Sequence, residues 1–170
     1  MNLPDNHQPG RQSKICCFTG HRRIPEAHMI PLYTSLDETI SALYDAGVRV
    51  FRAGGAIGFD TLAALRVIRF KAIEHSDVRL ELLLPCRNQT DRWPKEAIRD
   101  YNFILSRADS VTYVSEYYTR FCMHQRDRAL VDGSDYCVAY LTENRGGTAY
   151  TVSYALQNRL VLLNLGEAFL

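Results

Sequence analysis

Short apolar runs alternate with amphipathic stretches along almost the whole chain. The apolar runs predict strands at 15–19, 48–53, 80–84, 110–114, 136–140 and 160–163. The stretches between them repeat apolar residues at spacings of three and four, which predicts helices at 31–46, 59–75, 94–107, 119–131 and 148–158. Alternating strands and helices predict an α/β fold: a three-layer α/β/α sandwich with a mostly parallel sheet of about six strands.

The two ends of the chain and the first helix carry boundary signals. Pro31 suits the first turn of that helix, and Gly47 supplies its C-terminal stop. Residues 1–14 are polar, so we expect a disordered N-terminal tail there, and residues 164–170 are expected to be peripheral. No linker divides the rest of the 170-residue chain, so residues 15–170 are predicted to form a single domain.

Composition and charge narrow the class of protein. The formal net charge is +1, which argues against a general nucleic-acid or anionic-membrane binder but leaves room for a local basic site. No apolar run is long enough for a signal peptide or a membrane span, so we expect a cytoplasmic protein. The five cysteines form no CxxC pair and the five histidines show no ligand spacing, so we expect reduced thiols and no metal.

Three glycine-bearing turns follow predicted strands, and we expect them to converge. In a parallel sheet all strand-to-helix turns lie at one edge, and ligands bind there where the strand order reverses. In the commonest order, strands one and four flank that point and the turn after strand five lies beside it. Glycine lets the backbone approach a phosphate, and the neighbouring cations and hydroxyls donate to it. The predicted nucleotide-binding residues are Thr19, Gly20, His21, Arg22, Gly54, Gly55, Gly58, Asp60, Arg126, Gly146, Gly147 and Thr148.

Several of these residues also have a purely structural interpretation. Asp60 either caps the second helix or accepts hydrogen bonds from a ribose or from loop donors. Thr148 either caps the last long helix or binds a phosphate oxygen. Arg126 either reaches into the pocket or pairs at the surface with Asp127 or Asp132. Local sequence does not decide between these alternatives.

Taken in order, these motifs resemble the YpsA-type family of the SLOG superfamily, which includes the DprA/Smf proteins and the "lonely guy" phosphoribohydrolases. The resemblance runs from Ile15 to Leu163. The matching stretches are Cys17-Phe18-Thr19-Gly20-His21-Arg22, Gly54-Gly55-Ala56-Ile57-Gly58-Phe59-Asp60, Leu84-Pro85 with Gln89 and Trp93, Arg126, Val131-Asp132-Gly133-Ser134-Asp135 and Gly146-Gly147-Thr148. The resemblance implies a Rossmann-like domain that binds a nucleotide or a nucleotide-derived ligand and, by analogy with the phosphoribohydrolases, a homodimer.

The chain departs from the phosphoribohydrolases of that superfamily at the position of catalysis. Their glycine-rich turn has the form PGGxGTxxE, whereas this chain has Arg145-Gly-Gly-Thr-Ala-Tyr-Thr-Val-Ser153, without the Glu. Asp127 stands where those enzymes have Lys. Cleavage of an N-glycosidic bond needs a carboxylate to activate water or to stabilise the oxocarbenium charge. Asp60 and Asp132 are the candidates to replace the missing Glu.

Three functions follow from the residues and the resemblance. The first is binding of a ligand similar to ADP-ribose, NAD or AMP, in a sensor or a ligand-processing protein. The second is a nucleoside monophosphate phosphoribohydrolase, an N-glycosidase, which the missing Glu disfavours. The third, by analogy with DprA, is a single-stranded DNA-binding module, which the near-zero net charge disfavours. No cofactor is assigned beyond such a nucleotide or ADP-ribose-like ligand.

Overall fold

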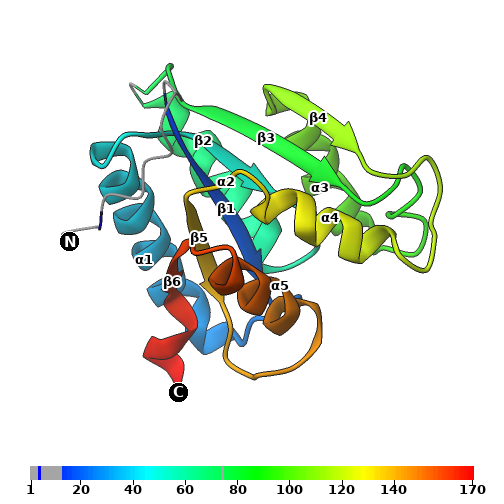
Figure 1. Cartoon of the computed structure of the whole chain (residues 1–170). Coiled ribbons are helices and arrows are strands. Elements are labelled where there is room, and N and C mark those ends of the chain that lie inside the picture. The colour runs from blue at the N-terminus through cyan, green and yellow to red at the C-terminus, as the bar shows by residue number, and fades with distance from the viewer. Residues whose placement is uncertain (1–3, 5–12, 74) are drawn as a thin grey trace.

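The chain forms one six-stranded parallel sheet in the computed structural model, which describes residue 4, residues 13–73 and residues 75–170. The strands are β1 (Lys14–Gly20), β2 (Val48–Ala53), β3 (Arg79–Leu84), β4 (Ser110–Tyr113), β5 (Tyr136–Tyr140) and β6 (Val161–Asn164). They lie side by side in the order β4-β3-β2-β1-β5-β6 (Figure 1). The predicted α/β class and the predicted strands are confirmed, and every strand pair is parallel.

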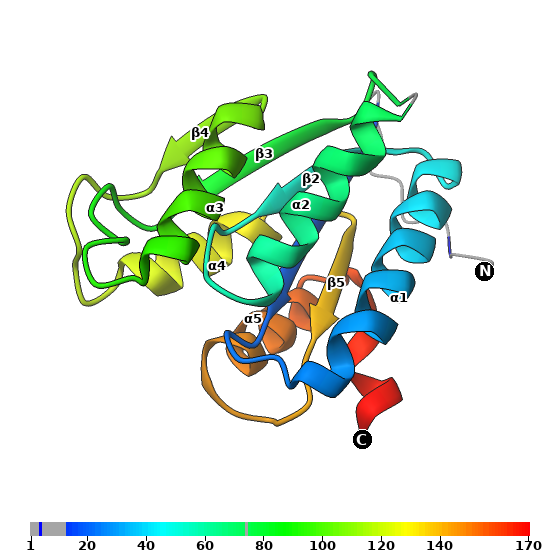
Figure 2. The same ribbon diagram turned by 180° about the vertical axis from the view of Figure 1, so that it is seen from behind.

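Helices cover both faces of this sheet. The described helices are α1 (Glu26–Asp45), α2 (Phe59–Ala72), α3 (Lys95–Arg107), α4 (Cys122–Val131) and α5 (Gly146–Gln157), and a 3-10 helix, η1 (Leu165–Phe169), follows β6. Helices α1, α2 and α3 lie on one face and α4 and α5 on the other, as two opposite views show (Figures 1 and 2). The three layers of the predicted sandwich are therefore present.

Alternate side chains of β1 enter two separate cores. Cys16 and Phe18 pack in the larger core with residues of α1 and α2, whereas Cys17 joins Leu130 and Cys137 in a smaller core with α4 and α5. Successive residues of a strand point to opposite faces, which confirms the expectation for the adjacent cysteines. Because β1 is covered on both faces, its sequence reads as a continuous apolar run rather than an alternating one.

The strand order corrects one expectation about the site. Strands β1 and β5, not strands one and four, flank the point where the order reverses. The chain places β2, β3 and β4 successively on one side of β1, and β5 then returns to pair with the other side of β1. The turn after β5 consequently lies at the reversal itself, opposite the turn after β1.

The first helix starts earlier than predicted. Helix α1 begins at Glu26 with Pro25 as its N-cap residue, so Pro31 lies inside the helix rather than in its first turn. The buried positions Leu32, Leu36 and Ile40 hold the helix against the sheet. The hydrogen bond that Pro31 cannot donate is lost near the solvent-exposed beginning of the helix, where water can satisfy the freed carbonyl.

Both chain ends differ from the expectation. Lys14 belongs to β1, and the rest of the predicted disordered tail lies outside the described residues except for Pro4 and Ser13. Residues 164–170 are only partly peripheral, because the ring of Phe169 stacks on His28 with centroids 4.1 Å apart, although Leu170 is exposed. The 3-10 helix η1 therefore covers part of the core, and apolar packing of its aromatic ring offsets the weak propensity of this short segment.

Candidate functional site

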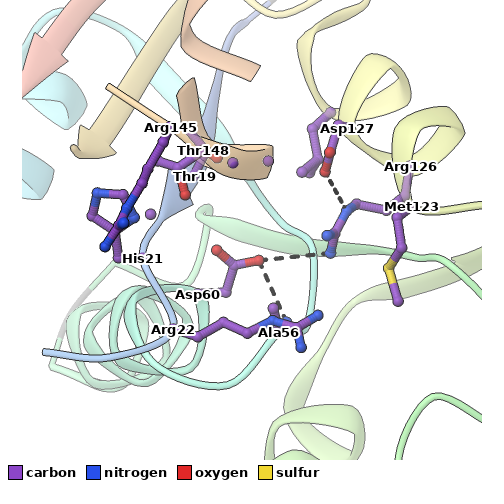
Figure 3. A pocket seen from close by; sticks show the side chains of 14 residues that line it. Thr19, His21, Arg22, Ala56, Asp60, Met123, Arg126, Asp127, Arg145 and Thr148 are labelled. Carbon is purple, nitrogen blue, oxygen red and sulfur yellow. Dashed lines mark hydrogen bonds and ion pairs between the residues drawn. The ribbon is translucent and has the colours of Figure 1, made fainter. Parts of the chain in front are cut away.

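A cavity of about 320 Å³ opens at the carboxyl ends of β1 and β5, where the strand order reverses. We call it the switch-point cavity. Its lining residues are Thr19, Gly20, His21, Arg22, Ala56, Asp60, Met123, Arg126, Asp127, Leu130, Arg145, Gly146, Gly147 and Thr148. The turns after β1 and β5 and the first turn of α2 thus converge, together with one face of α4 (Figure 3).

The glycine-rich turn before α2 contributes Ala56 to the cavity lining, while its glycines lie outside it. The predicted residues outside the lining are Gly54, Gly55 and Gly58. Gly58 has φ of +88°, and a Cβ atom there would overlap the backbone of Arg22. The backbone N–H of Phe59 donates to the carbonyl of His21 at 3.2 Å. Gly58 therefore lets the turn after β1 lie directly against the start of α2.

Arg126 is buried between two carboxylates. Its Nε donates to Oδ1 of Asp127 at 2.8 Å, and its Nη1 lies 3.8 Å from Oδ2 of Asp60. Nη1 also donates to the carbonyl of Gly54, where any side chain would overlap the guanidinium. The pairing with Asp127 is thus present, but in the cavity wall rather than at the surface. Asp132 lies outside the cavity lining and accepts instead from the hydroxyl of Tyr154.

Asp60 occupies the centre of the site (Figure 3). Its side chain caps no helix: Gly58 is the N-cap residue of α2, and the carboxylate accepts from the backbone N–H of Ala56 at 3.4 Å. Burial raises the pKa of Asp60 to about 6, even though Arg126 and backbone N–H groups lower it. A carboxylate with this pKa changes its protonation state close to neutral pH.

His21 holds the loop after β5 in place. Its Nε2 accepts from the backbone N–H groups of Thr142 and Glu143 at 3.2 and 3.3 Å. A nitrogen that accepts two hydrogen bonds carries no proton, so the ring is neutral and Nδ1 carries the hydrogen. Burial lowers the pKa of His21, Glu143 raises it and Arg145 lowers it. His21 therefore contributes hydrogen bonding, not a positive charge, to the site.

The first turn of α5 forms another side of the cavity. Gly146, Gly147 and Thr148 all line it, and the first turn contains no acidic residue. The first N–H groups of a helix have no partner within the helix, and they form the positive end of its dipole. The N-cap residue of α5 is Arg145, so Thr148 does not cap the helix. This combination is suited to a phosphate or a carboxylate.

Helix α4 supplies residues that were not predicted from the sequence. Met123, Asp127 and Leu130 line the cavity beside Arg126. Their spacing of three to four residues places them on one face of a helix, a signal that was available once Arg126 had been chosen. Met123 and Leu130 give this side of the cavity an apolar surface, which can contact the flat or hydrophobic part of a ligand.

Residues 14–160 match the family described as the YspA SLOG family (YpsA). The chain belongs to this family. A UPF0398 protein of Halalkalibacterium halodurans is 28% identical over 148 residues, which cover 79% of this chain and 76% of the relative. The resemblance to the YpsA-type family that the sequence suggested is therefore confirmed.

Two solved structures of DNA processing protein A share the fold. The protein of Streptococcus pneumoniae superposes with a TM-score of 0.63 and 17% identity, over 88% of this chain and 49% of that chain. The structure of the Helicobacter pylori protein addresses its single-stranded DNA binding mode. It superposes with a TM-score of 0.63 and 17% identity, over 89% of this chain and 64% of that chain. This chain spans about half of the streptococcal protein, and the likeness shows the fold alone.

No helix among the described residues combines the length and the apolar character that crossing a bilayer requires. Within the same part of the chain, no three His, Cys, Asp or Glu side chains gather as a metal site would need.

Proposed function

We propose that this member of the YpsA family binds a nucleotide or a nucleotide-derived ligand in the switch-point cavity. The observation that carries the proposal is the meeting of the N-terminus of α5 with the turn after β1 in one cavity. The N–H groups of α5 and the guanidinium of Arg22 would hold a phosphate. Asp60, a buried carboxylate that lines the same cavity, would accept hydrogen bonds from ribose hydroxyls.

A charge placed in the first turn of α5 tests the phosphate position. Thr148→Asp is expected to weaken binding of AMP and ADP-ribose at least about tenfold, because a carboxylate there repels a phosphate across a few ångströms. Asn has nearly the same shape as Asp but no charge. The affinity of Thr148→Asn for these nucleotides is therefore expected to stay within about threefold of that of the unmodified protein. Isothermal titration calorimetry with AMP, ADP-ribose and NAD measures all three affinities.

Two results would contradict this proposal. One is that well-folded protein binds none of the three nucleotides. The other is that the Asp and Asn variants bind them equally well, because the phosphate would then lie elsewhere. Thermal unfolding of both variants controls for folding; an acidic residue in the first turn of a helix is not expected to lower its stability through the helix dipole.

The environment of Asp60 also favours a second candidate function, hydrolysis of an N-glycosidic bond. Asp60 lines the cavity, is buried, and has its pKa raised to about 6 by burial. In this reaction an ionised carboxylate activates water or stabilises the positive charge on the ribose ring. Asp60 would thus take the role of the Glu that the glycine-rich turn lacks, whereas Asp132 lies outside the lining.

Release of adenine from AMP, followed by chromatography, tests this second function. The rate is expected to fall as the pH decreases through about 6, because protonation removes the required carboxylate. Asp60→Asn is expected to lower the rate about 10²–10⁴-fold, the usual contribution of such a group. Asp132→Asn serves as the matched control and should leave the rate unchanged. Absence of adenine release at every pH from 5 to 8 would restrict the protein to binding.

A further inference from the structure

A second cavity, of about 660 Å³, adjoins the switch-point cavity. We call it the arginine cavity; its lining residues are His21, Arg22, Arg23, Ile24, Pro25, Thr142, Glu143 and Arg145. His21, Arg22 and Arg145 line both cavities, so the two cavities are neighbours. Figure 3 shows Arg145 above His21, with Arg22 on the opposite side of Asp60. A ligand that occupied both cavities would pass these three residues.

The arginine cavity carries an excess of positive charge. Arg22, Arg23 and Arg145 line it, against the single carboxylate of Glu143. Arg145 Nε lies 2.5 Å from Oε2 of Glu143, whereas neither Arg22 nor Arg23 forms an ion pair with any residue that the structure describes. Two guanidinium groups are thus available to an anion, and guanidinium groups bind phosphate through paired hydrogen bonds.

We propose that the arginine cavity binds the second phosphate, and the group beyond it, of a ligand that contains two linked phosphates. This inference rests on the proposed function, and it narrows the ligand to the ADP-ribose class. The first phosphate would lie at the start of α5 near Arg22, the second would lie at Arg23, and the linkage would pass His21. Ile24 and Pro25 provide an apolar wall for the terminal sugar.

A nucleoside monophosphate would not contact the residues that line only the arginine cavity. Its one phosphate is served by the N-terminus of α5 and by Arg22, both in the switch-point cavity. Arg23 lines only the arginine cavity, and so do Ile24 and Pro25. The affinity is therefore expected to increase in the order AMP, ADP, ADP-ribose, with ADP-ribose at least about tenfold tighter than AMP, the effect of one charge-assisted contact.

Replacement of Arg23 tests the contribution of the arginine cavity independently of the switch-point cavity. Arg23→Ala is expected to weaken ADP-ribose about tenfold and AMP less than about twofold in calorimetric titrations. Arg99→Ala is the matched control: Arg99 is an exposed arginine of α3 outside both linings, so this variant changes the net charge equally. It should bind both ligands as the unmodified protein does.

Glu143→Gln provides a second test, in which the affinity for ADP-ribose is expected to increase rather than decrease. This change removes the one negative charge of the arginine cavity and frees Arg145, while the backbone N–H that bonds His21 remains. The affinity for ADP-ribose is expected to rise about threefold or more and that for AMP to rise less. A fall in ADP-ribose affinity in this variant would overturn the inference.

The outcomes distinguish this inference from the proposed function. Equal affinities for AMP and ADP-ribose, with Arg23→Ala affecting neither, would overturn the second phosphate site and leave nucleotide binding intact. A complete lack of binding of AMP, ADP and ADP-ribose would overturn the proposed function and with it the second site. Tighter ADP-ribose binding that depends on Arg23 but not on Arg99 supports both.

Discussion

Arg126→Met is expected to lower the free energy of unfolding by about 3–5 kcal/mol at pH 8, the usual cost of removing one partner from a buried ion pair. Arg126 is the cation between Asp60 and Asp127, and all three side chains are buried. Without the guanidinium, two carboxylates would remain in the cavity wall with no opposite charge. Urea denaturation followed by circular dichroism measures the change.

The pH dependence of this loss follows from the carboxyl groups. In the unmodified protein, burial raises the pKa of Asp60 from 3.8 to about 6, so the folded state holds this proton more tightly than the unfolded state. The contribution of Asp60 therefore favours folding below pH 3.8 and is lost as the pH rises to about 6. Removal of Arg126 raises this pKa further, so the destabilisation of Arg126→Met should shrink as the pH falls from 8 to 5.

Arg128→Met controls for the loss of a charge on the same helix. Arg128 is exposed, and its Nε donates to the hydroxyl of Tyr150 at 2.8 Å. Its replacement is expected to lower the free energy of unfolding by less than about 1 kcal/mol. Stability of Arg126→Met equal to that of Arg128→Met at pH 8 would show that the buried carboxylates do not depend on Arg126.

Gly58→Ala is expected to destabilise the protein by about 3 kcal/mol or more, since it combines two costs. Gly58 has φ +88° and ψ −123°, a backbone conformation that is almost exclusive to glycine, and another residue there costs about 1–3 kcal/mol. The new methyl group would also overlap the backbone of Arg22, and forcing such a shift costs about 1–3 kcal/mol. Because the displaced turn carries His21 and Arg22, ligand affinity should fall as well.

Gly146→Ala is the matched control for the steric overlap, because it introduces the same methyl group at a positive φ without that overlap. Gly146 also has a positive φ, +75°, but a Cβ atom there meets nothing within 4 Å. Its replacement should cost only the conformational part, about 1–2 kcal/mol. Thermal and urea unfolding of both variants give the comparison. Equal losses would mean that the contact between Gly58 and Arg22 contributes little to the fold.

The local sequence was sufficient to predict the class of fold and the convergence of the turns after β1 and β5 in one cavity. Buried strands read as apolar runs and amphipathic helices as repeats of three and four, so elements such as β1 and α2 lie close to their predicted positions. Parallel strands place their following turns at one edge, which is why Thr19 and Thr148, far apart in sequence, were expected in one cavity. The family resemblance rests on the same turns.

Other features depended on contacts between distant segments. Pro31 carries a local signal for a helix start, but packing of Leu32 and Leu36 against the sheet keeps the helix intact around it. Phe169 has no local pattern that marks it as partly buried, and its ring is covered because α1 brings His28 to it. Propensity is a weak signal at such positions, and tertiary packing overrides it.

The sequence by itself thus determined the alternating elements, the parallel sheet and the three glycine-bearing turns, since periodicity and turn chemistry are local properties. Only the tertiary structure decided that β5 lies beside β1 and that Arg126 is buried between Asp60 and Asp127. It also decided that the switch-point cavity and the arginine cavity share His21, Arg22 and Arg145 as lining residues. Strand order, burial and the charge around a carboxylate depend on which distant segments meet, and no local pattern encodes that.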